Sequence, residues 1–582
     1  MASTEATPGS DAADLKQAIN ALIESYKEMG MPVRRYVFIV LLPAIAFFFV
    51  SIVLSIALPL PLTVRVPIPL LGLLIGAAAV FYPKIVADQR RREIENKLPL
   101  LITHMTVLST TNIDRMEVFR TLAKEEEYDA AADEINYIVT LVDSWNQSLD
   151  DACRRRAKRT PSEAFSDFLE RIAYSLGAGQ ELKDFLLNEQ EVIINNYKTV
   201  YEGSLNNLDV MKDLYLSMVL SLTFGLVFAI VLPILTGTSP TGSVGAVIGL
   251  FILIQLGFFM AIRTVAPTDP IWYVPEEMKT DAERKSNLSL AAGVGLVVLV
   301  SLFTMGGLFG ILPIGLEEVL FFLDDVPLQL YIAIPLTPLI IPGLVLRGEE
   351  NDIKARDQEF PSFIRALGST ESAKQGTTSG VLESLRRKDF GKLSENVNNL
   401  YKRLNMRIET EEAWRHFTAE CHSYLIQKFS EMYLIGRQMG GDPKQLGELI
   451  SENMSEVLQL RERRQQETIT LIGLLYGITA ASTFAFFIGL KVVKILSNMS
   501  LNLDTSQFDF GSIINASVYN IPEIEYLLMI VIMFNALLSS LMIRTVDGGH
   551  KANSYFHFVM LIWLGLGISI LTQVLVGAIL TI

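Results

Sequence analysis

Few residues in this sequence have types and spacings that could support enzymatic chemistry. Asp389-Phe390-Gly391 spells the metal-binding tripeptide of protein kinases, but neither a glycine-rich strand loop nor an H-R-D motif precedes it. His416, Cys421 and His422 could share a metal ion, although their spacing favours a packed or solvated helix face. The G-x-x-x-x-G-K-[ST] run that cradles nucleotide phosphates is absent. We therefore expect no catalytic residue, no metal and no cofactor, and a chain that is not an enzyme.

The apolar residues are clustered in runs long enough to cross a membrane. Half of the 582 residues are hydrophobic, with a mean hydropathy of +0.36. The sequence predicts an all-α polytopic membrane protein with about nine spans. We place the spans at residues 36–58, 67–82, 214–235, 244–262, 288–314, 328–346, 469–490, 526–543 and 556–582.

The polar residues inside these spans are neutral, whereas ion pumps and transporters need ionisable groups at membrane depth. They are of the kind that forms hydrogen bonds between helices. The residues are Ser217, Ser221, Gln255, Asn535, Ser539, Ser540 and Gln573.

The basic residues predict the orientation in the membrane, because Lys and Arg concentrate in cytoplasmic connections. With the N-terminus inside, only Arg65, Lys491 and Lys494 of the 49 basic residues face outward. Both large loops are then cytoplasmic and the C-terminus lies outside. The outward link 497–525 contains two candidate N-glycosylation sites, Asn498 and Asn515. The net charge of −14 and the acidic loops argue against a nucleic-acid partner.

The order of loops and spans divides the chain into six segments. An N-terminal tail with an amphipathic helix (1–35) precedes the first two spans (36–85). A cytoplasmic helical domain (86–213), four spans (214–346), a second cytoplasmic helical domain (347–467) and three spans (468–582) follow. In each cytoplasmic domain we expect a proline, Pro99 or Pro361, at a helix start. About 84 residues later, each domain has a leucine, Leu182 or Leu446, that follows a glycine turn. We interpret the two domains as a duplicated helical bundle.

The glycine turns lie where each cytoplasmic domain returns to the membrane. Glycine supplies the positive φ of a tight turn, and in the second copy Asp442 can cap the next helix with Pro443 in its first turn. The helices 182–201 and 446–464 then continue toward a span without an obvious break, so we expect each to act as a lever between domain and membrane. The turn and lever candidates are Gly177, Gly179, Leu182, Gly440, Gly441, Leu446, Leu449 and Ile450.

Two dense basic clusters lie too far along the loops to be simple membrane anchors. Loop 86–213 contains 16 basic and 24 acidic residues, and loop 347–467 contains 19 and 20, so the second suits an acidic partner better. The arginines at 90–92 and 461–464 are explained by membrane topology. The docking candidates are Arg154, Arg155, Arg156, Lys158, Arg159, Arg386, Arg387 and Lys388.

This layout resembles the platform proteins of type II secretion and type IV pilus systems. The turns Gly177-Ala-Gly-Gln-Glu-Leu182 and Gly440-Gly-Asp-Pro-Lys-Gln-Leu446 are similar to the family's G-x-x-x-G-x-L turn. The nine-span layout and Arg544-Thr-Val-Asp-Gly-Gly-His550 look like the archaeal branch, which serves archaella and adhesive pili. The resemblance extends over nearly the whole chain beyond Tyr36.

The resemblance implies a platform above a hexameric secretion ATPase, which drives filament subunits, archaellin or pilin, from the membrane into a filament. Other motor components and membrane lipid are the further partners, and in an archaellum the platform would also transmit rotation. A homodimer would match a sixfold engine better than a monomer. An adhesive-pilus platform and, from another class, a transporter or permease are the alternatives.

Overall fold

The computed structural model describes residues 33–57, 67–111, 113–237, 240–275, 278, 280–308, 316–319, 326–374, 378–502 and 520–580. Over these residues the chain is helical, and its one extended pairing is an isolated bridge between Trp272 and Ser423. The predicted all-α class is confirmed for this part of the chain. The expected amphipathic helix before residue 33, the side chain of Asn498 and all of Asn515 lie outside the described residues.

Eight helices in the described ranges are long and apolar enough to cross a membrane, which confirms a polytopic membrane protein. The expected span at 67–82 forms the first part of another helix, α5 (Pro67–Ser109), several of whose side chains are not described. The first is formed by the consecutive elements α2 (Val33–Tyr36), η1 (Val37–Leu41) and α3 (Leu42–Ala57). The other seven are formed by α10 (Leu182–Val231), α12 (Pro240–Val265), α13 (Asp281–Leu308), α15 (Leu328–Leu336) with α16 (Ile340–Lys374), α21 (Pro443–Asn502), α22 (Ile521–Asp547) and α23 (Ser554–Leu580).

The chain divides into two compact units, Met1–Tyr197 and Lys198–Ile582. In the first, the end of α5 and the start of α10 pack with four short helices as bundle one. These are α6 (Arg115–Ala123), α7 (Ala130–Asp143), α8 (Leu149–Ala157) and α9 (Glu163–Gly177). Phe119, Phe165, Phe168 and Leu186 are fully buried in it.

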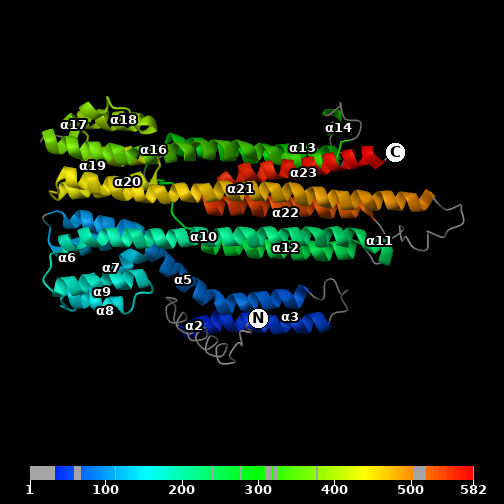
Figure 1. Ribbon diagram of the computed structural model, residues 1–582, viewed down its shortest axis with the longest axis horizontal. Coiled ribbons are helices and arrows are strands. Elements are labelled where there is room, and N and C mark those ends of the chain that lie inside the picture. The colour runs from blue at the N-terminus through cyan, green and yellow to red at the C-terminus, as the bar shows by residue number, and fades with distance from the viewer. Residues whose placement is uncertain are drawn as a thin grey trace, which may run out of the picture. The chain divides into compact units, whose positions relative to one another are not determined.

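The second unit contains the remaining spans and bundle two, formed by α16, α21 and four short helices. These are α17 (Thr378–Leu385), α18 (Ser394–Asn405), α19 (Thr410–Cys421) and α20 (Tyr424–Gln438). Figure 1 shows α17 and α18 at the end of this unit remote from α13 and α23. The core of bundle two is aromatic, because Phe363 packs against Phe360, Phe390, Trp414 and Phe417.

Backbone geometry supports the expected duplication. Outside glycine, L-residues rarely adopt a positive φ, yet Asn146 and Arg407 both do, at the same point between the second and third short helices of each bundle. They are 261 residues apart (407 − 146), and the positive-φ glycines of the two turns, Gly179 and Gly440, are separated by the same interval (440 − 179). Ser162 and Ser423, which cap α9 and α20, also differ by 261.

The prolines expected at helix starts lie instead inside helices, Pro99 in α5 and Pro361 in α16. A helix tolerates an internal proline where tertiary packing outweighs the lost hydrogen bond. Here the neighbours Leu98, Leu100 and Phe360 are buried. As a result, α5 and α16 run from a predicted span into a bundle, and α10 and α21 run from a bundle back to a span. Each of these four continuous helices crosses one of the segment boundaries expected at 86, 214, 347 and 468.

Candidate functional site

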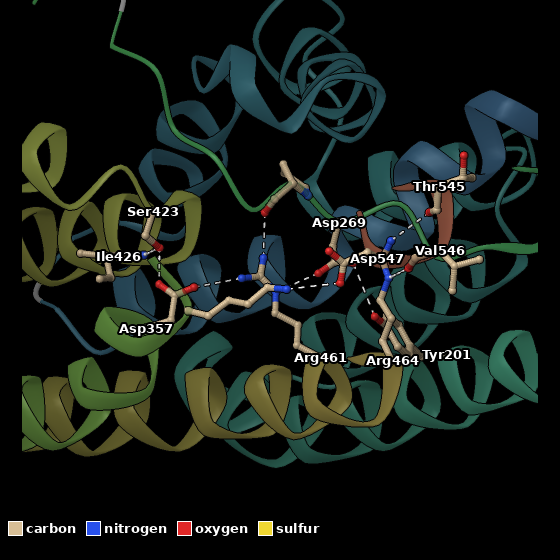
Figure 2. A network of polar contacts seen from close by, with 12 residues as sticks. Tyr201, Asp269, Asp357, Ser423, Ile426, Arg461, Arg464, Thr545, Val546 and Asp547 are labelled. Atoms are coloured by element: carbon tan, nitrogen blue, oxygen red, sulfur yellow. Dashed lines mark hydrogen bonds and ion pairs between the residues drawn. The ribbon is translucent and has the colours of Figure 1, made fainter. Parts of the chain in front are cut away.

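A buried network of ion pairs joins bundle two to the membrane helices of the second unit (Figure 2). Its centre is Arg461 and Arg464, one turn apart on α21 and both facing the loop between α12 and α13. The network also includes Asp269 from that loop and Asp357 from α16. We call these four residues the junction.

Arg461 connects two carboxylates and a backbone carbonyl. Its Nε atom is 2.8 Å from Asp269 Oδ2, and its Nη1 atom is 3.1 Å from Asp357 Oδ2. Its Nη2 atom donates to the carbonyl oxygen of Pro270 at 2.7 Å. The guanidinium group therefore links α21, α16 and the loop in one place.

Arg464 joins α21 to the C-terminal end of α22. Its side chain is 3% exposed and pairs with Asp269, while Nε donates to the carbonyl of Val546 and Nη2 to that of Thr545, at the end of α22. Tyr201 of α10 donates its hydroxyl proton to Asp269 at 3.5 Å. Burial alone would raise the pKa of Asp269, but Arg464 and Arg461 hold it below its usual value, so the carboxyl stays ionised.

Asp357 is tied to the start of α20 as well as to Arg461. Ser423 donates its hydroxyl proton to Asp357 and accepts the backbone N–H of Ile426 at 3.1 Å as the helix cap. The loop pairs with the same residues, because Tyr273 N–H donates to His422 O and Tyr424 N–H to Ile271 O. A loop of the membrane unit thus docks on the α19–α20 connection of bundle two.

Glu350 on α16 holds the connection between α22 and α23. Its carboxylate accepts the indole N–H of Trp272 at 3.0 Å, the backbone N–H of His550 at 2.6 Å and the amide of Asn553. A Cβ at Gly549 would lie 2.2 Å from Glu350 Oε1, and one at Gly548, where φ is +78°, would collide with Arg464. The Asp-Gly-Gly-His segment noted in the sequence therefore needs both glycines for close packing.

The interpretation of Arg461 and Arg464 as topology markers alone is wrong, because both are buried and paired. Arg463, with a side chain 60% exposed and paired to Glu202 of α10, does fit a boundary role. Sequence reasoning missed Asp269, Glu350 and Asp357 as partners. Asp269-Pro270 in a short loop between two spans was the available signal, since a carboxylate beside the membrane is costly unless it is paired.

The turn candidates adopt the geometry that their types predict. Gly179 and Gly440 have φ values of +84° and +86°, and Asp442 accepts the N–H of Gln445 at 3.0 Å. Leu446 and Ile450 are fully buried, Leu182 is 4% exposed, and Leu449 is half-buried. Gly177 ends α9, and Gly441 packs against Leu446. Whether these residues transmit motion stays a prediction.

The docking candidates differ in how far they are already paired. Arg156 binds Glu134, whose side chain is fully buried, and stacks on Tyr137, so it belongs to the packing of bundle one. Arg154 has only a long contact of 3.7 Å with Asp151, and Arg155, Lys158 and Arg159 are exposed. Arg386 stacks on Tyr401, while Arg387 and Lys388 are exposed beside it at the end of α17. The structure does not bring the two clusters into one unit.

The residues considered for chemistry have structural roles where they are described. Asp389 accepts the N–H of Gly391 and the hydroxyl of Ser394, as a helix-start residue does. Burial raises the pKa of both cysteines, Cys153 and Cys421, so neither is a reactive thiolate. Among the described residues no group of three His, Cys, Asp or Glu could hold a metal ion.

Polar residues within the spans join four membrane helices. Gln255 of α12 donates to Asn535 of α22 at 2.6 Å and to Tyr215 of α10 at 3.3 Å, and Asn535 donates to Thr479 of α21 at 3.0 Å. Gln573 of α23 donates to Glu525 of α22 at 2.8 Å, and Ser539 bonds to Asn535 on its own helix and to Tyr215 of α10. The expectation is wrong for three serines, which donate to carbonyls of their own helices. These are Ser217, Ser221 and Ser540.

Comparison with known proteins gives matches over most of the chain. Residues 101–233, which cover most of bundle one and the following span, match the sequence profile of type II secretion system (T2SS), protein F. The flagella accessory protein J of Methanocaldococcus jannaschii is 32% identical over 553 residues, 95% of this chain and 97% of that protein. The protein of the same name from Methanococcus voltae is 33% identical over 511 residues, 88% of this chain and 90% of its own length. No solved structure matches the chain.

Proposed function

The chain belongs to the family of flagella accessory protein J, the archaeal branch of the type II secretion protein F platforms, and from this membership we propose how it works. The family places it in the membrane as a platform of a type IV-like filament system. We propose that it is the archaellum platform, which couples a cytoplasmic hexameric ATPase to the insertion of filament subunits and to rotation. Loss of swimming, rather than of surface adhesion, in a strain lacking the chain would distinguish this role from that of an adhesive pilus.

The observation that supports coupling best is the continuity of the helices. α10 extends over 50 residues and α21 over 60, each from a turn at the far side of a bundle into a membrane span. A helix rises about 1.5 Å per residue and is stiff over this length when it is packed. A force on either bundle would therefore reach the membrane without passing through a flexible loop.

In bundle two the lever is a pair of helices rather than α21 alone. A Cβ at Gly368 of α16 would lie 2.2 Å from the carbonyl oxygen of Pro443, and one at Gly447 would lie 2.8 Å from that of Ile364. The two helices thus approach closely at the far end and are joined by Asp357 and Arg461 at the membrane end. We infer that α16 and α21 move as one rigid body.

The two bundles have different roles in this mechanism. At the repeat interval of 261, Arg461 and Arg464 correspond to Val200, which is 59% exposed, and to Gly203, which has open space around it. α10 therefore contains no equivalent of the two junction arginines. Beyond Tyr197 it is held to α21 by the exposed pairs Lys198–Glu456 and Glu202–Arg463 and by one buried pair, Lys212–Glu467. This difference supports a bundle two fixed to the membrane helices and a bundle one that moves.

The exposed cations at the end of α17 are the proposed contact with the ATPase. Arg387 and Lys388 form no ion pair with a described carboxylate. Other arginines of bundle two do form such pairs, namely Arg356, Arg403 and Arg437. Unpaired surface cations attract an acidic partner and speed its docking. The ATPase itself supplies hydrolysis, because this chain contains no phosphate-binding loop.

Binding of the purified partner ATPase to the full chain in nanodiscs tests this contact. Reversing Arg386, Arg387 and Lys388 to glutamate should weaken binding at least tenfold at low salt, and should flatten its salt dependence because the screened attraction is gone. The matched variant reverses Arg154, Arg155 and Arg159 in bundle one and should bind nearly as the wild type. If only the bundle-one variant loses binding, the contact is assigned to the wrong bundle.

A further inference from the structure

A polar cavity of about 80 Å³ lies beside the junction, at the ends of four membrane helices that are predicted to face the cytoplasm. Its lining comes from α16, α21, α22 and the start of α23, and includes Arg347, Glu350, Lys354, Arg544 and Asp547. A single water needs only about 10–15 Å³ of such space. The cavity is therefore large enough for several waters or for a small polar group.

The two carboxylates of the lining already have partners. Glu350 accepts three N–H donors, from Trp272, His550 and Asn553. Asp547 pairs with Lys354 at 3.2 Å. The donors to Glu350 are neutral, so its charge remains, but the lining still has three cations, Arg347, Lys354 and Arg544, against these two carboxylates.

The two arginines of the lining have no ion pair with a described carboxylate. Arg544 donates Nε to the carbonyl oxygen of Gly549 at 3.2 Å, and the Arg347 guanidinium lies 4.7 Å from the centre of the Phe556 ring. Both side chains are half-buried. By contrast, Arg461 and Arg464 of the junction each pair with a carboxylate. Two half-buried guanidinium groups with no directly paired carboxylate are a costly arrangement, which an anionic ligand would relieve.

We propose that this cavity binds a phosphate group, with Arg347 and Arg544 as its ligands. Arginine binds phosphate through two parallel N–H···O bonds, and the terminal nitrogens of both side chains form no hydrogen bond with the described residues. The buried Oδ1 of Asn553, also in the lining, has no partner among the described residues and can accept a hydrogen bond from the O–H of a monoprotonated phosphate or from a water beside it. At the membrane boundary the phosphate can belong to a lipid headgroup or to a free anion.

Ordinary boundary arginines provide the control. Arg263 ends α12 on the same face of the membrane, is exposed and does not line the cavity. Such residues attract anionic headgroups in general, without a site. The proposal predicts that Arg347 and Arg544 bind phosphate specifically and that Arg263 does not.

The full chain, delipidated in a neutral detergent, is titrated separately with inorganic phosphate, phosphatidylglycerol and phosphatidylcholine, and its melting temperature is measured. Sodium chloride at equal ionic strength is the blank. Phosphate or phosphatidylglycerol should raise the melting temperature saturably, and Arg347→Gln or Arg544→Gln should weaken that effect at least tenfold, whereas Arg263→Gln should not. A response to phosphatidylglycerol alone identifies the ligand as a lipid, and a response to both identifies a general phosphate site.

A saturable response that all three variants retain would overturn the proposal, as would a response no larger than that to chloride. If a glutamine variant does not fold, native mass spectrometry of the wild type decides. One phosphatidylglycerol or phosphate per chain should then resist removal, and binding that increases without a distinct first step would refute the site.

Discussion

Arg461 and Arg464 differ from Arg463 in what surrounds them, although all three lie within one turn of α21. The first two are buried against Asp269 and Asp357, and the third is exposed to solvent. Buried charges are tolerated only when they are paired and hydrogen-bonded. The junction therefore contributes a fixed geometry between bundle two and the membrane helices more than it contributes net stability.

Asp269→Asn should strongly destabilise the second unit. It removes the charge that Arg461 and Arg464 share and leaves one carboxylate, Asp357, for two buried guanidinium groups. Removing one partner of a buried pair costs about 3–5 kcal/mol. The measurement is thermal unfolding of the purified protein in detergent. Arg463→Gln, which breaks an exposed pair on the same helix, should change stability by less than about 1 kcal/mol; equal losses in the two variants would show that the junction is not special.

The sequence predicted local features of these residues well and their long-range partners poorly. Gly440, Asp442 and Pro443 determine a turn and a helix start by their own chemistry, and the structure has both. The partner of Arg461 lies 192 residues away in a loop. Nothing local to either residue predicts that pair, because it depends on how α12, α16 and α21 pack. The pairing of Arg156 with Glu134 could not be predicted for the same reason, since Glu134 comes from another helix.

At the scale of elements, the period of the chain was easier to predict than the ends of its helices. The similar distance from a proline to the leucine after each glycine turn indicated a duplicated bundle, and the repeated positive-φ positions support it. The prolines misled, because Pro99 and Pro361 look like helix starts by sequence but lie within long helices. Tertiary burial overrode local propensity at both positions.

Softening α21 should separate filament assembly from ATPase binding. Glu452 and Gln459 are exposed, so replacing both by glycine costs about 1 kcal/mol each in helix propensity without removing buried side chains. Leu449 and Ile450, the lever candidates, are less suitable because Ile450 is fully buried and its loss would destabilise the core. Cells expressing the double glycine variant should contain a platform that binds its ATPase but build few filaments, as counted by electron microscopy. Glu452→Ala with Gln459→Ala is the control; normal filament numbers in the glycine variant would show that stiffness in α21 does not matter.

The whole molecule contains two bundles of similar geometry, and only the helix that follows bundle two has the junction arginines. Both bundles have the same order of short helices, yet the junction arginines are present only after bundle two. A duplicated domain in one chain gives approximate twofold symmetry, and the junction breaks it. In the proposed mechanism, one fixed and one movable bundle let the ATP hydrolysis cycle of a symmetric ATPase produce a displacement in one direction. Two bundles attached to the membrane helices in the same way would not favour such a directed displacement.

The orientation in the membrane is the premise on which every cytoplasmic role depends, and it predicts a labelling pattern. Of 49 basic residues, 46 lie on the predicted inner side. Asn520, between α21 and α22, and Glu383, on α17, are both exposed in the structure and are predicted to face opposite sides. Both native cysteines are fully buried, so the maleimide should not label them. In intact cells an impermeant maleimide should therefore label Asn520→Cys and not Glu383→Cys, and after permeabilisation it should label both. The reverse pattern would place bundle two outside, where no ATPase could reach it, and the coupling mechanism would fail with the topology.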